Sequence, residues 1–269
     1  MVLLYNNHYY VTMGSIVFGP RVRRCTSAAL NDCQGIKIDA LRSAFGVIHV
    51  DSHFYFAGST GFGAGDSNVV RCNEAFSQCD VHHIGNLEPR GFVHHGKHLF
   101  VTSARDKNGA LCTLPSLSQC DEVVGANTRA VAFDGKHWVF GHRDNADRKS
   151  IYFCTRPEIS PQHCVQQHIP VGNLFYLDGI SYDGTRWYIS VGLYVNFAIE
   201  PVVIICSGGI NGFTNCHQRQ FPFTYQNPLG IGPVYIDGRG NYYVATYISS
   251  SMAYCTDALM TKCTIIDQI

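Results

Sequence analysis

Twelve cysteines are arranged in six short pairs that recur along the whole chain. Six to nine residues separate the two partners, and the first cysteine of a pair returns every 40 to 52 residues. A repeat of this length is typical of propeller blades or of helical arrays. The pairs are Cys25–Cys33, Cys72–Cys79, Cys112–Cys120, Cys154–Cys164, Cys206–Cys216 and Cys255–Cys263.

These pairs are better explained as disulfides than as metal ligands. The sequence contains no CxxC motif and no Cys/His cluster with zinc spacing. Partners across a tight hairpin fall within the Cα separation that a disulfide requires. We therefore predict six disulfides, one for each pair. Twelve oxidised cysteines indicate an oxidising compartment, either extracellular or periplasmic.

Composition excludes several classes of partner. The formal net charge is zero and the pI is about 7.2, so nothing points to a nucleic-acid partner or a charged membrane surface. No apolar run approaches the roughly 18 residues of a membrane span, and no membrane insertion is expected. The first residues, MVLLYNNHYY, lack the basic start and long apolar core of a signal peptide. Nothing in the composition indicates an oligomeric state.

Each cysteine pair is preceded by an apolar strand, a tight turn and an aromatic strand. The clearest copy is GISYDGTRWYISVG at residues 179–192, where Asp183 and Gly184 predict a two-residue turn with positive φ at both positions. VLLYNNHYYVTMG at residues 2–14 has Asn6 and Asn7 at its turn. The other copies begin at Phe45, Arg90, Arg129 and Gly232.

Four strands per repeat predict an all-β fold, a six-bladed β-propeller with four antiparallel strands per blade. The disulfide of each blade closes the hairpin between its third and fourth strands. Period-2 alternation around the turns argues against helical repeats. We expect a single domain over residues 1–269, with blades at about 1–38, 39–85, 86–125, 126–170, 171–221 and 222–269.

Small and aromatic residues recur at fixed places in the repeat. The innermost strand is crowded, and small residues are expected where it begins, at Gly46, Gly91, Ala130, Gly179 and Gly232. The second strand carries a large apolar residue in what we take as one register. These residues, expected to form the core between blades, are Tyr55, Leu99, Trp138, Trp187 and Tyr242.

The last blade, GIGPVYIDGRGNYYVATYISSSMAYC, resembles the repeat of NHL-type six-bladed propellers. The NHL pattern is approximately P-x-G-I-A-V-D-x-x-G-N-I-Y-V-A-D, followed by R-I-x-x-F, and the likeness covers the first three strands of each blade. The cysteine-closed hairpin is not part of that pattern, and the Asp after the second strand is missing in most blades. Some NHL-like propellers are lyases or hydrolases with zinc held by histidines, so the resemblance leaves an enzyme open.

Functional residues are expected on the face formed by the loops after the second and fourth strands, because these loops differ between blades. Arg90, Arg129 and Asp178 share one register at the start of the first strand and should meet at the mouth of the central channel. Loops of blades 3 to 5 add the remaining candidates, which are Arg105, His142, Arg143, Tyr194 and Phe197.

Arginine suits carboxylate, sulfate or phosphate groups, and exposed aromatic rings suit sugar faces. An equally good explanation of Arg90, Arg129 and Asp178 is a salt bridge lining the channel. Arg105 and Arg143, each beside an aspartate, fit ordinary solvated loop charges when taken alone.

Thirteen histidines raise the question of a metal. His94, His95 and His98 are expected to be solvated on a turn, whereas His49 on an innermost strand is a better candidate for the channel. No cofactor is predicted, and calcium or zinc in the channel stays open. Motifs of a nucleophile or a phosphate loop are absent.

Two functions of different classes follow. The first is a secreted propeller that recognises a small polar or carbohydrate ligand on the variable-loop face. The alternative is an extracellular metal-dependent lyase or hydrolase with its site at the mouth of the channel. The sequence leaves open whether the chain is an enzyme.

Overall fold

The structure of the protein is a computed structural model. It describes residues 1–14, 21–59, 67–84, 87–103, 108–124, 130–141, 149–157, 162–172, 174–195, 198–223, 231–246 and 251–266. These residues form strands, turns and irregular segments, and they contain no helix. None of the described segments therefore offers a helix that could span a membrane.

The strands form six four-stranded antiparallel sheets, which we call blades 1 to 6 in chain order. The chain divides into two compact units, Met1–Glu122 and Val123–Gln268. Unit 1 contains blades 1 to 3. Its strands are β1 (Val2–Tyr5), β2 (His8–Thr12), β3 (Val22–Cys25), β4 (Cys33–Ile36), β5 (Ser43–Val50), β6 (His53–Ser59), β7 (Ser67–Asn73), β8 (Cys79–His83), β9 (Pro89–His95), β10 (His98–Ser103), β11 (Asn108–Thr113) and β12 (Cys120–Val124), whose last two residues are assigned to unit 2.

Unit 2 contains blades 4 to 6. Its strands are β13 (Val131–Phe133), β14 (Trp138–Gly141), β15 (Ser150–Cys154), β16 (Cys164–His168), β17 (Leu174–Tyr182), β18 (Trp187–Val195), β19 (Ala198–Gly209), β20 (Gly212–Gln220), β21 (Tyr235–Ile236), β22 (Tyr242–Ala245), β23 (Met252–Cys255) and β24 (Cys263–Ile266).

The predicted fold class is confirmed: the chain is all-β, with the six four-stranded blades of a β-propeller. All six predicted disulfides are present, each between the third and fourth strands of its blade. In blade 4, for example, Cys154 and Cys164 are direct cross-strand partners. Six such bridges are typical of an oxidising compartment. The single domain and the blade boundaries expected from the sequence stay predictions.

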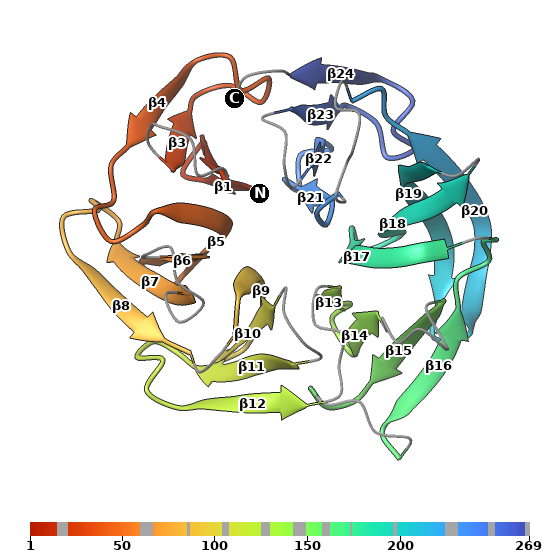
Figure 1. The fold of residues 1–269 in the computed structure, drawn as a ribbon, viewed down its shortest axis with the longest axis horizontal. Coiled ribbons are helices and arrows are strands. Elements are labelled where there is room, and N and C mark those ends of the chain that lie inside the picture. The colour runs from red at the N-terminus through yellow and green to blue at the C-terminus, as the bar shows by residue number, and fades with distance from the viewer. Residues whose placement is uncertain are drawn as a thin grey trace. The chain divides into compact units, whose positions relative to one another are not determined.

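Within unit 1, the first strands β1, β5 and β9 lie side by side, and the last strands β4, β8 and β12 lie on the outside (Figure 1). The close packing of first strands explains two glycines. A Cβ on Gly46 would come within 2.7 Å of the Gly91 Cα, and a Cβ on Gly179 would overlap the backbone of Pro233. Small residues are therefore required where neighbouring backbones touch. Gly46, Gly91 and Gly179 lie within their strands, however, and not at the strand starts where we expected them.

The turn between the first two strands takes two forms. In blade 1, Tyr5 pairs with His8, and Asn6 and Asn7 have φ of 46° and 60°, as the sequence predicts.

In blade 5, Tyr182 pairs with Trp187, so the predicted two-residue turn at Asp183 and Gly184 is wrong. The connection has four residues because Asp183 Oδ1 accepts hydrogen bonds from the backbone N–H groups of Thr185 (2.8 Å) and Arg186 (2.7 Å). Gly184 has a φ of 96°.

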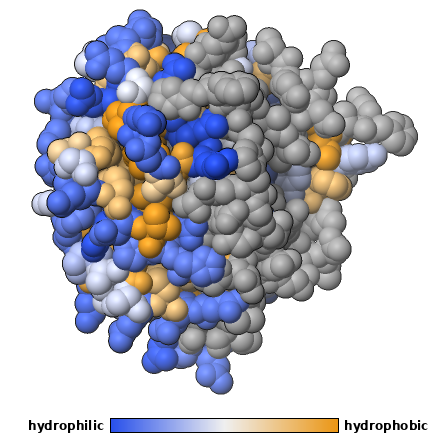
Figure 2. Space-filling model, turned by 60° about the vertical axis from the view of Figure 1, so that its left-hand side comes forward, coloured by the Kyte–Doolittle hydropathy of each residue, from blue (hydrophilic) through white to orange (hydrophobic). Residues whose placement is uncertain are grey.

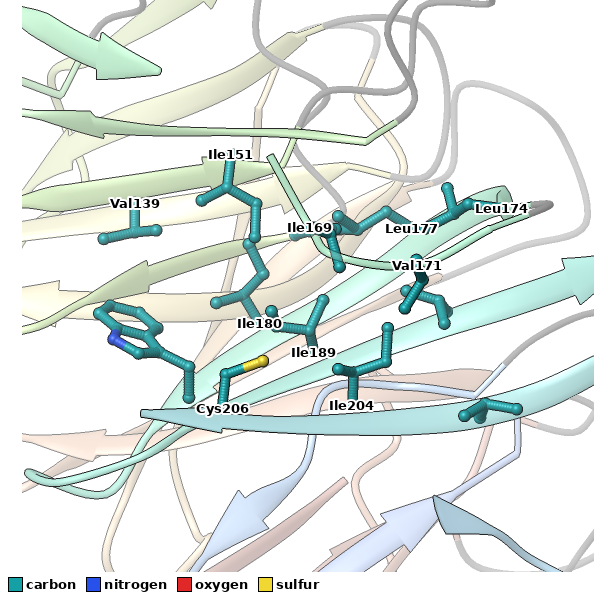
Figure 3. Close-up of a cluster of buried hydrophobic side chains, with 14 of the residues drawn as sticks. Val139, Ile151, Ile169, Val171, Leu174, Leu177, Ile180, Ile189, Ile204 and Cys206 are labelled. Atoms are coloured by element: carbon teal, nitrogen blue, oxygen red, sulfur yellow. The ribbon is translucent and has the colours of Figure 1, made fainter. Parts of the chain in front are cut away.

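Hydrophobic cores lie between successive blades of each unit. The core between blades 4 and 5 contains Val139, Ile151, Ile180, Ile189 and Ile204, which point toward one another in Figure 3. Equivalent cores join blades 1 and 2, blades 2 and 3, and blades 5 and 6. Each blade thus buries apolar side chains on the faces that meet its neighbours within the unit.

The large residues of the second strands are buried as predicted, but one of them was assigned to the wrong register. Trp187 contacts the core shared with the preceding blade, and Leu99 and Tyr242 do the same. Tyr55 instead contacts the core shared with the following blade, and Phe54 occupies the register of Trp187. Successive strand residues point to opposite faces, so an offset of one residue reverses the face.

The outer strands present polar side chains to solvent. In blade 2, β8 carries the sequence CDVHH, and in blade 4, β16 carries CVQQH, with the same alternation of intermediate and exposed residues. In the coloured part of the space-filling view, hydrophilic residues surround a smaller group of hydrophobic residues (Figure 2). Short, polar outer strands discourage edge-to-edge association.

The loop closed by a disulfide, which we call the bridged loop, contacts the preceding blade in blades 2, 3, 5 and 6. Tyr55 of blade 2 donates a hydrogen bond to the Pro115 carbonyl of the next bridged loop (3.2 Å). Tyr188 of blade 5 donates to the equivalent Ala258 carbonyl (3.1 Å), and Arg219 donates to the Leu259 carbonyl (2.7 Å). The tyrosines and the loops are thus recurring contacts between consecutive blades.

Apolar side chains from the bridged loops complete these contacts. The residue three positions before the second cysteine enters the core that its blade shares with the preceding blade: Phe76 in blade 2, Leu117 in blade 3 and Met260 in blade 6. Phe213, at the same position in blade 5, packs against Phe153 of blade 4 with ring centroids 6.0 Å apart. The disulfides therefore close loops that belong to the cores between blades.

Trp187→Ala is expected to lower the free energy of unfolding by about 3 to 5 kcal/mol. The indole is 1% exposed and packs edge-to-face on Phe153, and its N–H donates to the Gly208 carbonyl (3.0 Å). Chemical denaturation of both proteins would measure the difference. A change close to zero would contradict the burial of Trp187.

Tyr188→Phe is expected to destabilise the protein by about 1 to 3 kcal/mol, because it removes the one hydroxyl proton that Asp183 Oδ2 (2.7 Å) and the Ala258 carbonyl (3.1 Å) share. Burial acts to raise the pKa of Asp183, but hydrogen bonds from Tyr188 and from backbone N–H groups hold it below the usual value. The matched control is Leu259→Ala, which keeps the loop backbone and removes a partly exposed side chain. Equal destabilisation of the two variants would contradict a role for the tyrosine hydroxyl.

Candidate functional site

The structure describes three of the eight predicted ligand residues, namely Arg90, Asp178 and Tyr194. The other five, Arg105, Arg129, His142, Arg143 and Phe197, lie outside the described residues. Arg90 belongs to unit 1 and Asp178 to unit 2, so the expected meeting of Arg90, Arg129 and Asp178 stays a prediction.

Arg90 is held in place at the start of β9. Its guanidinium lies over the Phe45 ring, 3.8 Å from the centroid, and one of its nitrogens lies 3.5 Å from a Glu88 carboxylate oxygen. A Cβ on Gly14 would come within 2.7 Å of the same Phe45 ring, so the ring is enclosed between blades 1 and 3. Stacking and ion pairing orient the guanidinium at this end of unit 1.

Asp178 is buried within blade 5, with 1% of its surface exposed. It lies in an irregularity of the β17–β18 pairing, where Leu177 is opposite Val191 and Gly179 is opposite Ser190. An additional residue of this kind bends a strand and redirects a side chain. The carboxylate is therefore a fixed internal group of unit 2.

Tyr194 is exposed and has an aromatic neighbour. Tyr194 and Phe175 are 44% and 41% exposed, and their ring centroids are 6.3 Å apart with an interplanar angle of 30°. Tyr176, which is buried, lies 5.8 Å from Phe175, and its ring covers Gly192, where a Cβ would overlap it. The three rings form an aromatic group at the end of blade 5 opposite the Asp183 turn, and we call the exposed pair the aromatic pair.

Sequence reasoning missed Phe175. The strand before Asp178 has the sequence LFYL, in which alternation alone does not tell the buried ring from the exposed one. A pairing irregularity between Leu174 and Tyr176 adds one residue there and brings Phe175 toward Tyr194. Irregularities of this kind leave no pattern in a single sequence.

A second cluster, in unit 1, joins blades 1 and 2 at the strand ends that lie away from Arg90. The Tyr5 hydroxyl donates a hydrogen bond to Glu74 Oε1, and His49 Nε2 lies 3.1 Å from the same oxygen. The rings of Tyr5 and His49 are stacked with centroids 3.6 Å apart, and Phe54 lies 4.8 Å from His49. His49 is thus engaged between two blades, with Glu74 supplied by a bridged loop.

Burial and hydrogen bonding in this cluster favour the neutral form of His49 and the ionised form of Glu74. Burial lowers the pKa of His49, and Glu74 offsets only part of this effect. The hydrogen bond from Tyr5 holds the pKa of Glu74 below its usual value. The side chains are 13% exposed for His49 and 46% exposed for Glu74, so the cluster is open to solvent on the Glu74 side.

Metal-binding geometry is not found among the described residues. No group of three His, Cys, Asp or Glu side chains in that part of the chain is arranged to hold a metal ion. Calcium or zinc in a channel stays a prediction from the sequence.

Comparison with solved structures shows a likeness in fold. A chain of the nidogen/laminin complex superposes with a TM-score of 0.65 and 11% identity, over 96% of this chain and 92% of that chain. A protein from Lactobacillus plantarum superposes with a TM-score of 0.59 and 9% identity, over 100% of this chain and 82% of that chain. Hydrazine synthase of Kuenenia stuttgartiensis superposes with a TM-score of 0.50 and 11% identity, over 81% of this chain and 77% of that chain. At these identities the likeness concerns the fold alone.

No family model and no curated protein matches the sequence. The NHL subtype therefore stays a resemblance, while the six-bladed fold itself is shown.

Acidification is expected to weaken the contact between blades 1 and 2. The folded pKa of His49 is lowered from 6.5, so the unfolded chain takes up the proton first. The stabilisation is complete above about pH 6.5 and is lost as the pH falls through the folded pKa. Glu74, whose pKa is lowered from 4.5, adds a loss of the same sign at lower pH.

Thermal unfolding across a pH series would measure this effect. His49→Phe should lose the part of the pH dependence just below about pH 6.5, and His217→Phe on the exposed face of β20 is the control. An unchanged pH dependence in His49→Phe would contradict the assignment.

Proposed function

We propose that this protein is a secreted binding module that recognises a polar or carbohydrate ligand, with the aromatic pair of Phe175 and Tyr194 as its stacking surface. The observation that carries the proposal is the exposure of two neighbouring aromatic rings on one blade end. Large aromatic side chains are usually buried, so two exposed together on a rigid strand pair favour a binding role.

Carbohydrate fits this surface by its chemistry. A pyranose has apolar C–H faces that stack on aromatic rings, and hydroxyl groups at its edge that need polar partners. The Phe175 ring packs edge-to-face against the buried Tyr176 ring, with centroids 5.8 Å apart. A platform ordered before binding loses little conformational entropy when a ligand arrives.

The remaining predicted residues would supply the polar contacts. Arg90, Arg105, Arg129, His142 and Arg143 are retained in the proposal as donors to hydroxyl or anionic groups, with Phe197 as a further ring, whereas Asp178 is buried within blade 5 and is not retained as a ligand contact. Arginine offers paired donors to a carboxylate or sulfate. Among them, Arg90 is already oriented by Phe45 and Glu88.

A secreted binding role also agrees with the disulfides. In blades 2, 3, 5 and 6 the bridged loop packs against the preceding blade. The loops at the other ends of the blades can then vary, which is how binding sites are built on rigid scaffolds. One similar chain comes from a complex of nidogen with laminin, so a protein of this fold is bound there to another protein. No observation among the described residues favours the lyase or hydrolase alternative.

A glycan array probed with the purified protein is the first test. Tyr194→Ala and Phe175→Ala should each weaken binding to any glycan found by about tenfold or more, because each removes one stacking ring. The matched control is Val165→Ala, since Val165 is 45% exposed but lies on β16 in blade 4. A glycan whose affinity is unchanged in both aromatic variants would contradict the proposed site.

A further inference from the structure

Two asparagines of the chain are followed directly by glycine, Asn108 and Asn211. An asparagine in this pair can lose its side-chain nitrogen without an enzyme, because glycine leaves the next peptide nitrogen unshielded by a side chain. The structure places the two pairs in different surroundings. Asn211 lies at the tip of a hairpin, whereas Asn108 begins the strand β11. The proposed ligand site uses neither of them.

Asn211 lies in the connection between β19 and β20, at the tip of the bridged loop of blade 5. Gly209 and Gly212 are cross-strand partners on either side of Ile210 and Asn211. The positive φ of this turn falls on Gly212, at 109°, and not on Asn211. Glycine at a position of positive φ after such a turn is typical of hairpins that close with a bulge. The glycine after Asn211 is therefore favoured by the fold itself.

The peptide that joins Asn211 to Gly212 is accessible. Asn211 is exposed, and its side chain makes no hydrogen bond in the part of the chain that the structure describes. A Cβ on Gly212 would have the Gln167 side-chain oxygen as its nearest described neighbour, at 3.9 Å. The peptide therefore has room to rotate, and the Gly212 nitrogen can approach the Asn211 side chain.

Gly109, by contrast, is enclosed within blade 3. Its strand β11 lies between β10 and β12, and the glycine is buried. A Cβ there would come within 2.7 Å of the Phe100 ring and 2.8 Å of the Val101 carbonyl oxygen. Rotation of the peptide before Gly109 therefore requires a central strand to leave its sheet, whereas rotation before Gly212 requires only the opening of a hairpin tip.

We propose that Asn211 is a site of spontaneous modification, where the protein converts slowly to aspartyl and isoaspartyl forms while Asn108 is protected. The Gly212 backbone nitrogen loses its proton and attacks Asn211 Cγ, which closes a cyclic succinimide and releases the side-chain nitrogen as ammonia. Water then opens the ring. Cleavage of the bond to Cγ gives aspartate, and cleavage of the bond to the main-chain carbonyl carbon gives isoaspartate. Water is the only co-reactant.

The modified residue lies beside contacts that hold blade 5 against blade 4. The Ile210 carbonyl accepts a hydrogen bond from Gln167 Nε2 of blade 4 (2.6 Å), and Phe213 packs against Phe153. Isoaspartate adds one methylene to the backbone at the tip, so the short connection no longer fits and the Ile210 carbonyl is displaced. Aspartate keeps the backbone length and adds only a charge. The isoaspartyl form is therefore expected to weaken the contact between the two blades more than the aspartyl form.

Ageing of the purified protein in mildly alkaline buffer is the test, because the attacking nitrogen must lose its proton. Peptide mapping by mass spectrometry follows each asparagine, and labelling with a protein isoaspartate methyltransferase counts isoaspartyl residues. In the folded protein, Asn211 should convert at least about tenfold faster than Asn108, because the two sites differ in the free energy of local opening. In the reduced and denatured chain, the two should convert at similar rates.

Asn211→Gln and Asn108→Gln are matched variants for the labelling. After ageing, the first should lose most of the methyl label and the second should keep it. Asn211→Asp reproduces the charge without the longer backbone, so it should unfold close to the temperature of the fresh parent protein. The aged parent protein, rich in isoaspartate, should unfold at a lower temperature than either.

Two results would overturn the proposal. One is conversion of Asn108 in the folded parent protein at the same rate as Asn211, or faster, which would mean that the fold does not select the site. This measurement needs no variant. The other is equal methyl label in aged Asn211→Gln and aged parent protein, which would place the isoaspartate at another residue.

Discussion

The bridged loop packed on the preceding blade is the contact on which the rest of this structure depends. In it, a short disulfide-closed loop accepts hydrogen bonds from a buried tyrosine of the neighbour and inserts one apolar side chain into the shared core. Tyr55 with Pro115 and Tyr188 with Ala258 show the same arrangement in the two units. The disulfide is useful here because it limits the conformations of a loop that must fit a fixed acceptor position.

This arrangement separates two kinds of surface. The ends of the blades with the short turns and bridged loops are occupied by contacts between blades, such as Tyr5, His49 and Glu74. In unit 1, the opposite ends bear Arg90 with Phe45. In unit 2, the aromatic pair of Phe175 and Tyr194 lies at the end of blade 5 opposite the Asp183 turn.

The fold could be predicted from the sequence because its main constraints are local. Cysteine spacing, hairpin turns and strand alternation each involve neighbours in the chain, and the six disulfides followed from them. Other features depend on contacts between blades. The core shared with blade 3 sets the register of Tyr55. Hydrogen bonds to the Asp183 side chain set the four-residue connection, and an irregularity in strand pairing sets the exposure of Phe175. The meeting of Glu74 with Tyr5, 69 residues away, lies beyond any local pattern.

The direction of the bridged loops has a consequence for the growing chain. Phe76, Leu117 and Met260 each complete a core with the blade that precedes them in sequence. During synthesis from the N-terminus, the contact between two blades is therefore completed only after the later blade has been made and its disulfide has formed. We expect the most recently synthesised blade to be the least protected part of the growing chain.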